Sequence, residues 1–367
     1  MARESLFESV PNFSEGSRAD VIAAIASAAS KAFVLDVDAD ADHNRVVMSL
    51  AGVRQRLIDG LLPAIAEAAG RIDLREHRGV HPRVGAADVV PIVPLGETPI
   101  DACREVAHEV GERVWEELRL PVFFYGHGEA HTLADIRAGR VQPALGGPDP
   151  HPTAGAVCVG ARRALVAFNV MLYETDIIAA RALARSLRES TDGLRGVQAL
   201  AFELPGRRVQ LSMNLFRIDE TTPADVLAQL ARRGVPLGPE QVVGLCPAVA
   251  ASGAADGRLL EGRLARAAAA DGAARCEQVG GEEHIALSAR LRAEADELGR
   301  LPADEDAILA GAERAAALIR VLDAAGVVDT EVDAMLAAAA LGLRAAISPA
   351  TESIYRARVD ALDARLA

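Results

Sequence analysis

The sequence lacks an excess of basic residues. Its 367 residues include 39 Lys and Arg against 52 Asp and Glu, so the formal net charge at pH 7 is −13. Nucleic-acid phosphates are bound by a basic face, whereas the arginines here do not gather into a long run. The composition therefore argues against nucleic acid as a partner. An anionic small molecule would have to be held by locally placed Arg side chains and backbone N–H groups.

Long apolar segments and a cysteine framework are also missing. No charge-free stretch of about 18 apolar residues occurs, and the first residues, MARESLFESV, lack the charged start and apolar core of a signal peptide. The four cysteines are far apart and form no C-x-x-C pair, which argues against structural zinc and against a disulfide scaffold. We therefore expect a soluble, cytoplasmic protein with buried thiols and no membrane partner.

Hydrophobic patterning predicts two successive β-α-β-β-α-β units. In the first unit we expect strands at 6–10, 33–40, 45–52 and 88–95 and helices at 18–31 and 53–69. A helix at 98–119, a strand at 122–126 and a helical turn at 132–139 then lead to the second unit. There we expect strands at 164–172, 197–204, 208–216 and 242–247, with a tight turn at 205–207, and helices at 174–189 and 223–233.

This order predicts an α/β (α+β) fold with two ferredoxin-like sandwich subdomains, each an antiparallel sheet with helices on one face. A cleft or tunnel between two such sheets is the natural place for a ligand. Beyond residue 286, helix-start signals recur at Asp304, Asp329 and Ser348, and strand-like runs vanish. The predicted domains are 1–160, 161–285 and a helical C-terminal extension at 286–367.

Two clusters of acidic and histidine residues resemble metal sites only superficially. Asp36, Asp38 and Asp40 have the spacing of a calcium loop, but Ala41 replaces the required glycine and Val47 the closing glutamate. His127 and His131 are four residues apart with Glu129 between them, but Gly126 and Gly128 break the helix that a zinc protease motif needs. We expect no metal. On a strand, Asp36 and Asp38 share one face, which makes them a solvated edge or part of a site.

A histidine follows in the segment HRGVHPRVGAADVVPIVP (77–94), just before a strand. Gly79 and Gly85 permit a tight, exposed backbone around His81, Pro82 stiffens it, and Arg83 places a guanidinium nearby. Residue chemistry alone leaves His81 open between a turn residue and an acid–base catalyst.

A second segment rich in glycine and proline runs from Gly146 to Gly155. It holds too many prolines for a phosphate-binding loop and lacks the G-K-[ST] ending. Its composition fits an interdomain linker as well as it fits a lining for a flat heterocycle.

Five motifs together resemble the formiminotransferase family, which forms the N-terminal half of the formiminotransferase-cyclodeaminases. They are VPNFSEG (10–16), LDVDAD followed by NR (35–40, 44–45), HRGVHPRVGAADVVPIVP (77–94), IRAG (136–139) and GARRALVAFNVML (160–172). The resemblance runs from about residue 6 to about residue 280. It implies two α/β subdomains, with transfer of a formimidoyl group from N-formimidoyl-L-glutamate to N5 of tetrahydrofolate, the co-substrate.

The resemblance also implies roles for individual residues. His81 is the expected acid–base residue, and Asp38 is expected near it. The folate-binding stretch corresponds to Gly147, Pro148, Asp149, Pro150, His151, Pro152, Thr153, Ala154 and Gly155. This stretch is shorter here than in the vertebrate enzymes, and Ala154 stands where they carry an aromatic residue.

Several arginines are candidates for binding substrate carboxylates. Arg83 and Arg45, and also Arg162 or Arg163, have the chemistry to hold substrate carboxylates by bidentate pairing, although an arginine beside a strand is often only a surface residue. The tail lacks the Gly-rich G-G-G-S segment of the cyclodeaminases, so we expect no cyclodeaminase activity. Closed symmetry favours a homodimer.

Two alternatives stay open. One is transfer from another donor, such as formylglutamate or formimidoylglycine. The other is a non-catalytic folate-binding or partner-binding protein of the same fold, with the helical tail as its interaction surface.

Overall fold

The computed structural model describes residues 4–80, 82–251 and 253–366. These residues form a mixed α/β structure with two sheets and a C-terminal run of five helices, divided into two compact units. The first unit comprises Ser5–Arg163. The second comprises the chain from Ala164 onward together with Glu4, whose Oε2 accepts a hydrogen bond from Thr330 Oγ1 (2.8 Å).

The first unit is built on one large sheet with four helices. Its strands are β1 (Leu6–Ser9), β2 (Asn12–Phe13), β3 (Phe33–Asp40), β4 (Arg45–Val53), β5 (Ala87–Leu95), β6 (Val122–Gly126) and β7 (Val157–Ala161). Its helices are α1 (Ala19–Ala28), α2 (Arg54–Arg71), α3 (Ile100–Leu118) and α4 (Leu133–Arg137). The predicted strands and helices of this part are confirmed to within a few residues, whereas β2 and β7 were not predicted.

The prediction of a purely antiparallel first sheet is wrong at one edge. Strands β1, β3, β4 and β5 pair antiparallel, but β7 lies between β5 and β6 and is parallel to both. The run VCVGA of β7 is short and apolar throughout. Such a run shows no period that separates a buried parallel strand from other structure, so its pattern gave no signal.

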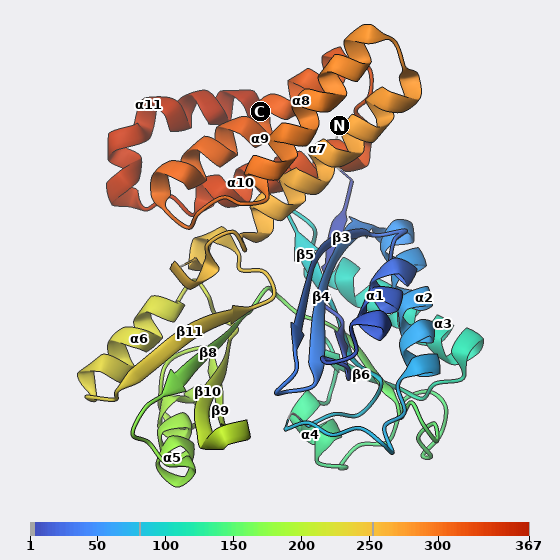
Figure 1. Ribbon diagram of the computed structural model, residues 1–367, viewed down its shortest axis with the longest axis vertical. Helices are drawn as coiled ribbons and strands as arrows, with labels where there is room; N and C mark the ends of the chain where they lie inside the picture. The colour runs from blue at the N-terminus through green and yellow to red at the C-terminus, as the bar shows by residue number, and fades with distance from the viewer. Residues whose placement is uncertain (1–3, 81, 252, 367) are drawn as a thin grey trace. The chain divides into compact units, whose positions relative to one another are not determined.

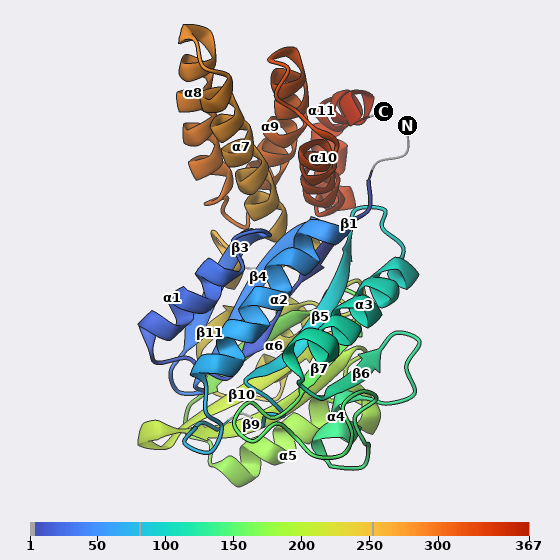
Figure 2. The ribbon, with the colours of Figure 1, turned by 90° about the vertical axis from the view of Figure 1, so that its right-hand side faces the viewer.

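Helices α1, α2 and α3 lie over one face of this sheet (Figure 2). Between them and the sheet is the main core, whose largest fully buried side chains include Phe13, Ile25, Met48, Leu57 and Ile92. A smaller apolar cluster on the opposite face includes Val89, Phe123, Tyr125, Ile136 and Cys158, with Ile136 contributed by α4. Polar side chains occupy other positions of that opposite face and provide the candidate site.

The second unit contains a four-stranded sheet and two flanking helices. Its strands are β8 (Val166–Leu172), β9 (Val197–Leu204), β10 (Arg208–Leu215) and β11 (Leu237–Val243), and its helices are α5 (Ile177–Leu187) and α6 (Pro223–Arg232). The sheet order is β11-β8-β10-β9, and every pairing is antiparallel, as predicted. The tight turn between β9 and β10 is confirmed, with positive φ at Gly206 and Arg207.

The predicted position of the last strand, 242–247, is wrong. Strand β11 begins at Leu237 and ends at Val243, and its register shifts between Leu237 and Glu240. Its sequence LGPEQVV begins with residues that rarely form strands. An edge strand with a register shift tolerates them because one side of its backbone needs no partner strand.

The C-terminal helices are α7 (Leu260–Val279), α8 (Glu282–Leu298), α9 (Glu305–Ala324), α10 (Thr330–Ala345) and α11 (Pro349–Leu366), visible together in Figure 1. The helix starts predicted at Asp304 and Asp329 are confirmed, because each side chain accepts a hydrogen bond from a first-turn backbone N–H. Ser348 Oγ likewise accepts from Thr351 N (3.2 Å). The domain boundaries at 160/161 and 285/286 stay predictions. None of the helices in the described ranges has the length and apolarity needed to span a bilayer.

Candidate active site

The loop between α2 and β5 carries the HPRVGA motif. His81 itself lies outside the described residues, but its neighbours are well tied down. Arg83 Nη1 is 2.8 Å from His77 Nε2, and Arg83 Nη2 donates to the Gly79 carbonyl (3.1 Å). Since a guanidinium can only donate, this nitrogen of His77 acts as the acceptor. The predicted carboxylate-binding residue Arg83 therefore braces its own loop.

The same loop is held against the connection between β3 and β4. Asn44 Nδ2 donates to the Arg78 carbonyl (2.7 Å), while Asn44 Oδ1 accepts from Gly16 N (2.8 Å). A Cβ on Gly79 would lie 2.6 Å from the His43 carbonyl oxygen, so no other residue fits this close approach without a shift. Asn44 thus joins the SEG, NR and HRGVHPR motifs into one local structure.

A buried carboxylate lies at the end of this loop. Asp88 has no exposed surface, and it is the extra residue where the register of β5 against β2 shifts between Asn12 and Phe13. Its Oδ1 accepts a hydrogen bond from Val84 N (2.5 Å). Irregularities of this kind redirect a side chain out of the regular alternation, and here Asp88 fixes the loop three residues beyond position 81.

Two arginines converge on the other oxygen of Asp88. Arg45 Nη1 donates to Asp88 Oδ2 (3.0 Å), and Arg137 Nη2 donates to the same oxygen (3.1 Å). Arg45 is further fixed by Asn12, whose Oδ1 accepts from Arg45 Nε (2.8 Å). Burial raises the pKa of Asp88, but Arg45, Arg137 and the Val84 N–H together outweigh it and hold that pKa below its usual value. Asp88 is therefore a carboxylate.

Asp38 lies on the same sheet face as Arg45. In β4, Val46, Met48 and Leu50 point into the core below the helices, so the residues between them point to the other face. Asp38 pairs with Val47, and Asp36 pairs with Ser49. The predicted alternation of the β3 carboxylates is thereby confirmed, and each is half-buried. The pairing of Asp38 with His81 remains a prediction.

The predicted folate segment folds back beside the HPRVGA loop. Gly155 forms an antiparallel bridge with Gly85, Ala86 N donates to the Ala154 carbonyl (2.8 Å), and Ala156 N donates to the Val84 carbonyl (3.2 Å). A Cβ at Gly85 would lie 1.9 Å from the Ala156 carbonyl oxygen. The two motifs are thus adjacent in the first unit, although about 70 residues separate them in the chain.

The members of the folate segment have different environments. Residues 147–150 are exposed, whereas Ala154 is 2% exposed and packs in the main core. His151 shapes the turn: its Nδ1 accepts from Ala154 N (3.1 Å), and its backbone bonds reciprocally with Gly155. The exposed residues and Thr153 can therefore offer side chains to a ligand, whereas Ala154 and Gly155 offer chiefly their backbone geometry.

The histidine pair at 127 and 131 takes no part in a metal cluster. Among the described residues no group of three or more His, Cys, Asp or Glu side chains is arranged to hold a metal ion. His127 Nε2 is 2.8 Å from Asp101 Oδ1, and Glu129 instead binds His108 Nε2 (2.8 Å) and Arg104 Nε (2.9 Å). Glu129 is thus engaged in ion pairs with neighbouring side chains.

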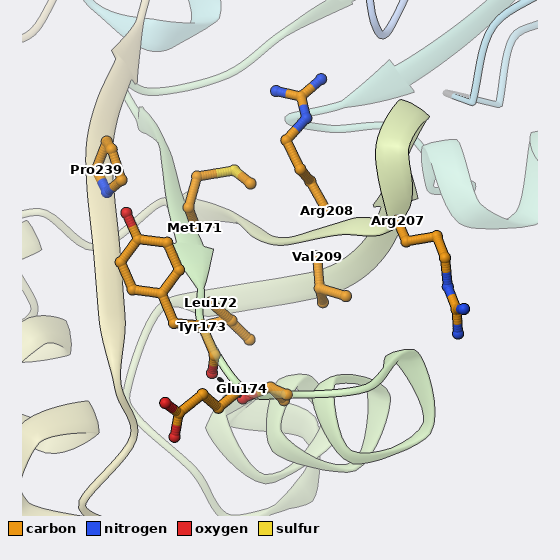
Figure 3. A pocket seen from close by; sticks show the side chains of 9 residues that line it. Met171, Leu172, Tyr173, Glu174, Arg207, Arg208, Val209 and Pro239 are labelled. Atoms are coloured by element: carbon orange, nitrogen blue, oxygen red, sulfur yellow. Dashed lines mark hydrogen bonds between the residues drawn. The ribbon is translucent and has the colours of Figure 1, made fainter.

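A pocket of about 530 Å³ lies elsewhere, in the second unit. It is lined by Met171, Leu172, Tyr173, Glu174, Thr175, Arg207, Arg208, Val209 and Pro239. Figure 3 shows Arg207 and Arg208 extending in opposite directions, so they do not converge on one anion. Met171 and Leu172 come from the GARRALVAFNVML motif, but none of the predicted site residues lines this pocket. Its mixed charges give no acid–base pair. We assign it no role in the chemistry.

Sequence reasoning missed Asp88, Arg137, Asn12 and Asn44 as members of the candidate site. A signal for Asp88 was present, because a lone carboxylate inside the apolar run ADVVPIVPL requires a partner when the strand is buried. Arg137 and Asn44 lay within quoted motifs, but only the tertiary structure connects them to the loop.

Comparisons with known proteins agree with this architecture. Residues 6–162 match the family model described as formiminotransferase domain, N-terminal subdomain. The chain is 34% identical over 269 residues to a glutamate formimidoyltransferase of Streptococcus pyogenes serotype M1, which covers 67% of this chain and 90% of that protein. It is 36% identical over 300 residues to a glutamate formimidoyltransferase of Thermoplasma acidophilum, covering 72% of this chain and 99% of that protein.

A longer relative is similar over part of its length. The formimidoyltransferase-cyclodeaminase of Rattus norvegicus is 36% identical over 272 residues, which cover 66% of this chain and 50% of that protein. The class defined by these matches is that of the one-carbon group transferases. The chain belongs to the formiminotransferase family.

Proposed function

We propose that this protein is a glutamate formimidoyltransferase that transfers the formimidoyl group of N-formimidoyl-L-glutamate to N5 of tetrahydrofolate. The observation that carries the proposal is the similarity to two glutamate formimidoyltransferases along 90% and 99% of their lengths. The joined SEG, NR, HPRVGA and folate motifs support it, because they form one contiguous structure in the first unit.

In the proposed reaction, N5 attacks the amidine carbon and forms a tetrahedral adduct. Glutamate leaves when its nitrogen gains a proton, while N5 loses one. An imidazole such as that of His81 can accept the first proton and deliver the second, because its ordinary pKa lies near neutral pH. Asp38 would orient this ring and stabilise its charged form, as the carboxylate does in a catalytic triad.

The folate and carboxylate contacts belong to the same proposal. Residues Gly147–Gly155 would contact tetrahydrofolate, and Arg45 and Arg83 would contact substrate carboxylates. Both arginines also have partners within the protein: Arg45 donates to Asn12 and Asp88, and Arg83 contacts His77 and Gly79 in its own loop. No metal enters this mechanism.

The proposal also covers the architecture of the two sheets and the location of the protein in the cell. We propose that both sheets are variants of the ferredoxin-like βαββαβ arrangement, the first extended by β7 and β6. The strand orders support this assignment. The antiparallel strands lie in the order β5-β1-β4-β3 in the first unit and β11-β8-β10-β9 in the second, which is the same order when the four strands of each unit are counted along the chain. A cytoplasmic homodimer is also proposed.

The direct test is an assay of the purified protein with tetrahydrofolate and N-formimidoyl-L-glutamate. We expect 5-formimidoyltetrahydrofolate and free glutamate in equal amounts. N-formylglutamate and N-formimidoylglycine, offered separately and in competition, should react with a lower kcat/KM. Preference for either compound would replace the donor in the proposal, and folate binding in calorimetry without any transfer would favour a non-catalytic protein.

A further inference from the structure

Two arginines converge on the single buried carboxylate of Asp88. One carboxylate, fully buried, receives Arg45 and Arg137 on the same oxygen at 3.0 and 3.1 Å. The other oxygen is engaged by Val84 N. Two guanidinium groups therefore share a single carboxylate oxygen.

Both arginine side chains are largely shielded from solvent. The side chains of Arg45 and Arg137 are only 12% and 24% exposed. Buried charges are normally matched one to one, since removing an ion from water is costly. Burial depresses the pKa of Arg45; Asp88 opposes this effect, and Arg137 adds to it by repulsion, so the pKa stays below its usual value. An anion next to Arg137 would oppose this repulsion.

Arg137 has donor capacity left for such an anion. A guanidinium carries five N–H donors in a planar fork that matches a carboxylate. Arg137 Nη2 donates to Asp88, whereas its buried Nε has no hydrogen-bond partner within the described ranges. Leaving a buried donor unsatisfied is unfavourable, so an acceptor oxygen that reached this nitrogen would be stabilised.

We propose that Arg137, together with Arg45, binds a carboxylate of a substrate, and that Asp88 is the positioning residue that holds the two arginines and the 82–85 loop in place. This inference rests on the proposed function, whose substrates supply the ligand: the donor and the glutamate tail of the folate both carry two carboxylates. Recognition of a carboxylate is common to both sources, and the experiment distinguishes them.

The experiment measures kcat and the KM of each substrate for Arg137→Gln and Arg137→Lys. We expect Arg137→Gln to raise one of the two KM values about 10- to 100-fold, as the loss of a charge-assisted hydrogen bond does. Arg137→Lys should show a smaller rise, because it keeps the charge but not the fork. The matched control is Arg140→Gln, which removes an exposed arginine paired with Asp135 and should leave both KM values unchanged.

Substrate analogues that lack a carboxylate identify which substrate supplies the carboxylate that Arg137 binds. N-formimidoyl-4-aminobutyrate and N-formimidoyl-2-aminobutyrate each lack one carboxylate of the donor, and tetrahydropteroate lacks the glutamate of the folate. The wild type should discriminate strongly against one of these compounds, and Arg137→Gln should lose that discrimination. KM values within twofold of wild type for both substrates, in a variant with unchanged circular dichroism, would overturn the inference.

Binding separates this inference from the proposed function. Calorimetric titration with L-glutamate, the expected product, requires no turnover. Weaker glutamate binding by Arg137→Gln than by the wild type, in a protein that transfers no formimidoyl group, would retain the carboxylate site and reject the transferase activity. If the wild type is active, and Arg137→Gln matches it in both kinetics and titration, the carboxylate site is rejected and the transferase activity is retained.

Discussion

At the scale of single residues, the proposed chemistry depends on His81. Its replacement by alanine removes the group that would move both protons, so we expect kcat to fall about 10²- to 10⁴-fold. The measurement is steady-state transfer activity, with thermal unfolding to show that the fold is intact. His127→Ala, in the same unit and paired with Asp101, is the matched control and should stay active. Full activity of His81→Ala would end its assignment as the acid–base residue.

The replacement of Asp88 should affect mainly stability, because Asp88 is buried and ion-paired. Its pKa in the folded protein lies below that of an ordinary aspartate, so its stabilising effect is fully present above about pH 4 and is lost as the pH falls through the folded pKa. Asp88→Asn should therefore lower the free energy of unfolding at pH 7 by about 3 kcal/mol. The difference from wild type should shrink as the solution is acidified below pH 4.

Chemical denaturation between pH 3 and pH 7 measures this effect. Glu117→Gln is the control, since it removes an exposed carboxylate that pairs with Arg113 on the surface and should change stability little. In the kinetic assay, Asp88→Asn should also raise the same KM that Arg137→Gln raises. A stability loss without that KM change would make Asp88 purely structural.

At the scale of secondary-structure elements, the contact between the HPRVGA loop and the folate segment depends on glycine. Gly155 has φ +70°, and a Cβ there would lie 2.3 Å from the Val84 carbonyl oxygen. Gly234 has φ +66°, but a Cβ there would have open space around it, with no atom of the described residues outside its immediate chain neighbours within 4 Å. Gly155→Ala should therefore destabilise the protein by about 1–3 kcal/mol more than Gly234→Ala.

Thermal unfolding of the two glycine variants measures that difference, and the assay should show a raised KM for tetrahydrofolate in Gly155→Ala alone. Equal stabilities of the two variants would mean that the segment 147–155 accommodates the added methyl group without strain. In that case the loop and the folate segment would not depend on each other for their positions.

A buried carboxyl joins the C-terminal helices to the turn Ala248–Ala250, which follows β11. Glu261, in α7, is 7% exposed and accepts a hydrogen bond from Ala248 N (2.9 Å). A Cβ on Gly342 of α10 would lie 2.6 Å from its Cγ, so the two helices approach closely here. Burial raises the pKa of Glu261 to about 7. This carboxyl is therefore favourable when neutral and unfavourable when ionised.

The sign of the resulting pH dependence follows from that raised pKa. Below the ordinary glutamate pKa the wild type has its full stability, and this contribution is lost as the pH rises toward about 7. Glu261→Gln should remove the loss, so its stability relative to wild type should be about 3 kcal/mol greater at pH 8 than at pH 4.5. Denaturation curves at the two pH values test this. A difference that does not change with pH would mean that Glu261 is neutral or ionised throughout.

At the scale of the whole molecule, the chain has two compact units. The main core cluster lies entirely within the first unit, so that unit can lose its structure without exposing the core of the second. We expect calorimetry to resolve two unfolding transitions. Asp88→Asn should lower the temperature of only one of them, and Glu261→Gln at pH 8 should raise the temperature of only the other. One cooperative transition shifted by both variants would show that the units unfold together.

Much of the fold was accessible from the sequence because local rules governed it. The β3 strand at 33–40 and its alternating carboxylates follow from a period of two, and the starts of α6, α9 and α10 follow from side-chain caps. Strands β7 and β11 did not follow such rules. The first is a short apolar run without period, and the second is a polar edge strand with an irregular register.

The sequence by itself determined the family motifs, the strand alternation that puts Asp36 and Asp38 on one face, and the helix starts. Each of these depends on residues close together in the chain. Only the tertiary structure decided that Asp88 receives Arg45 from 43 residues away and Arg137 from 49 residues away, and that Gly85 meets Gly155. These contacts depend on strand order and on close backbone approach, which no local pattern encodes.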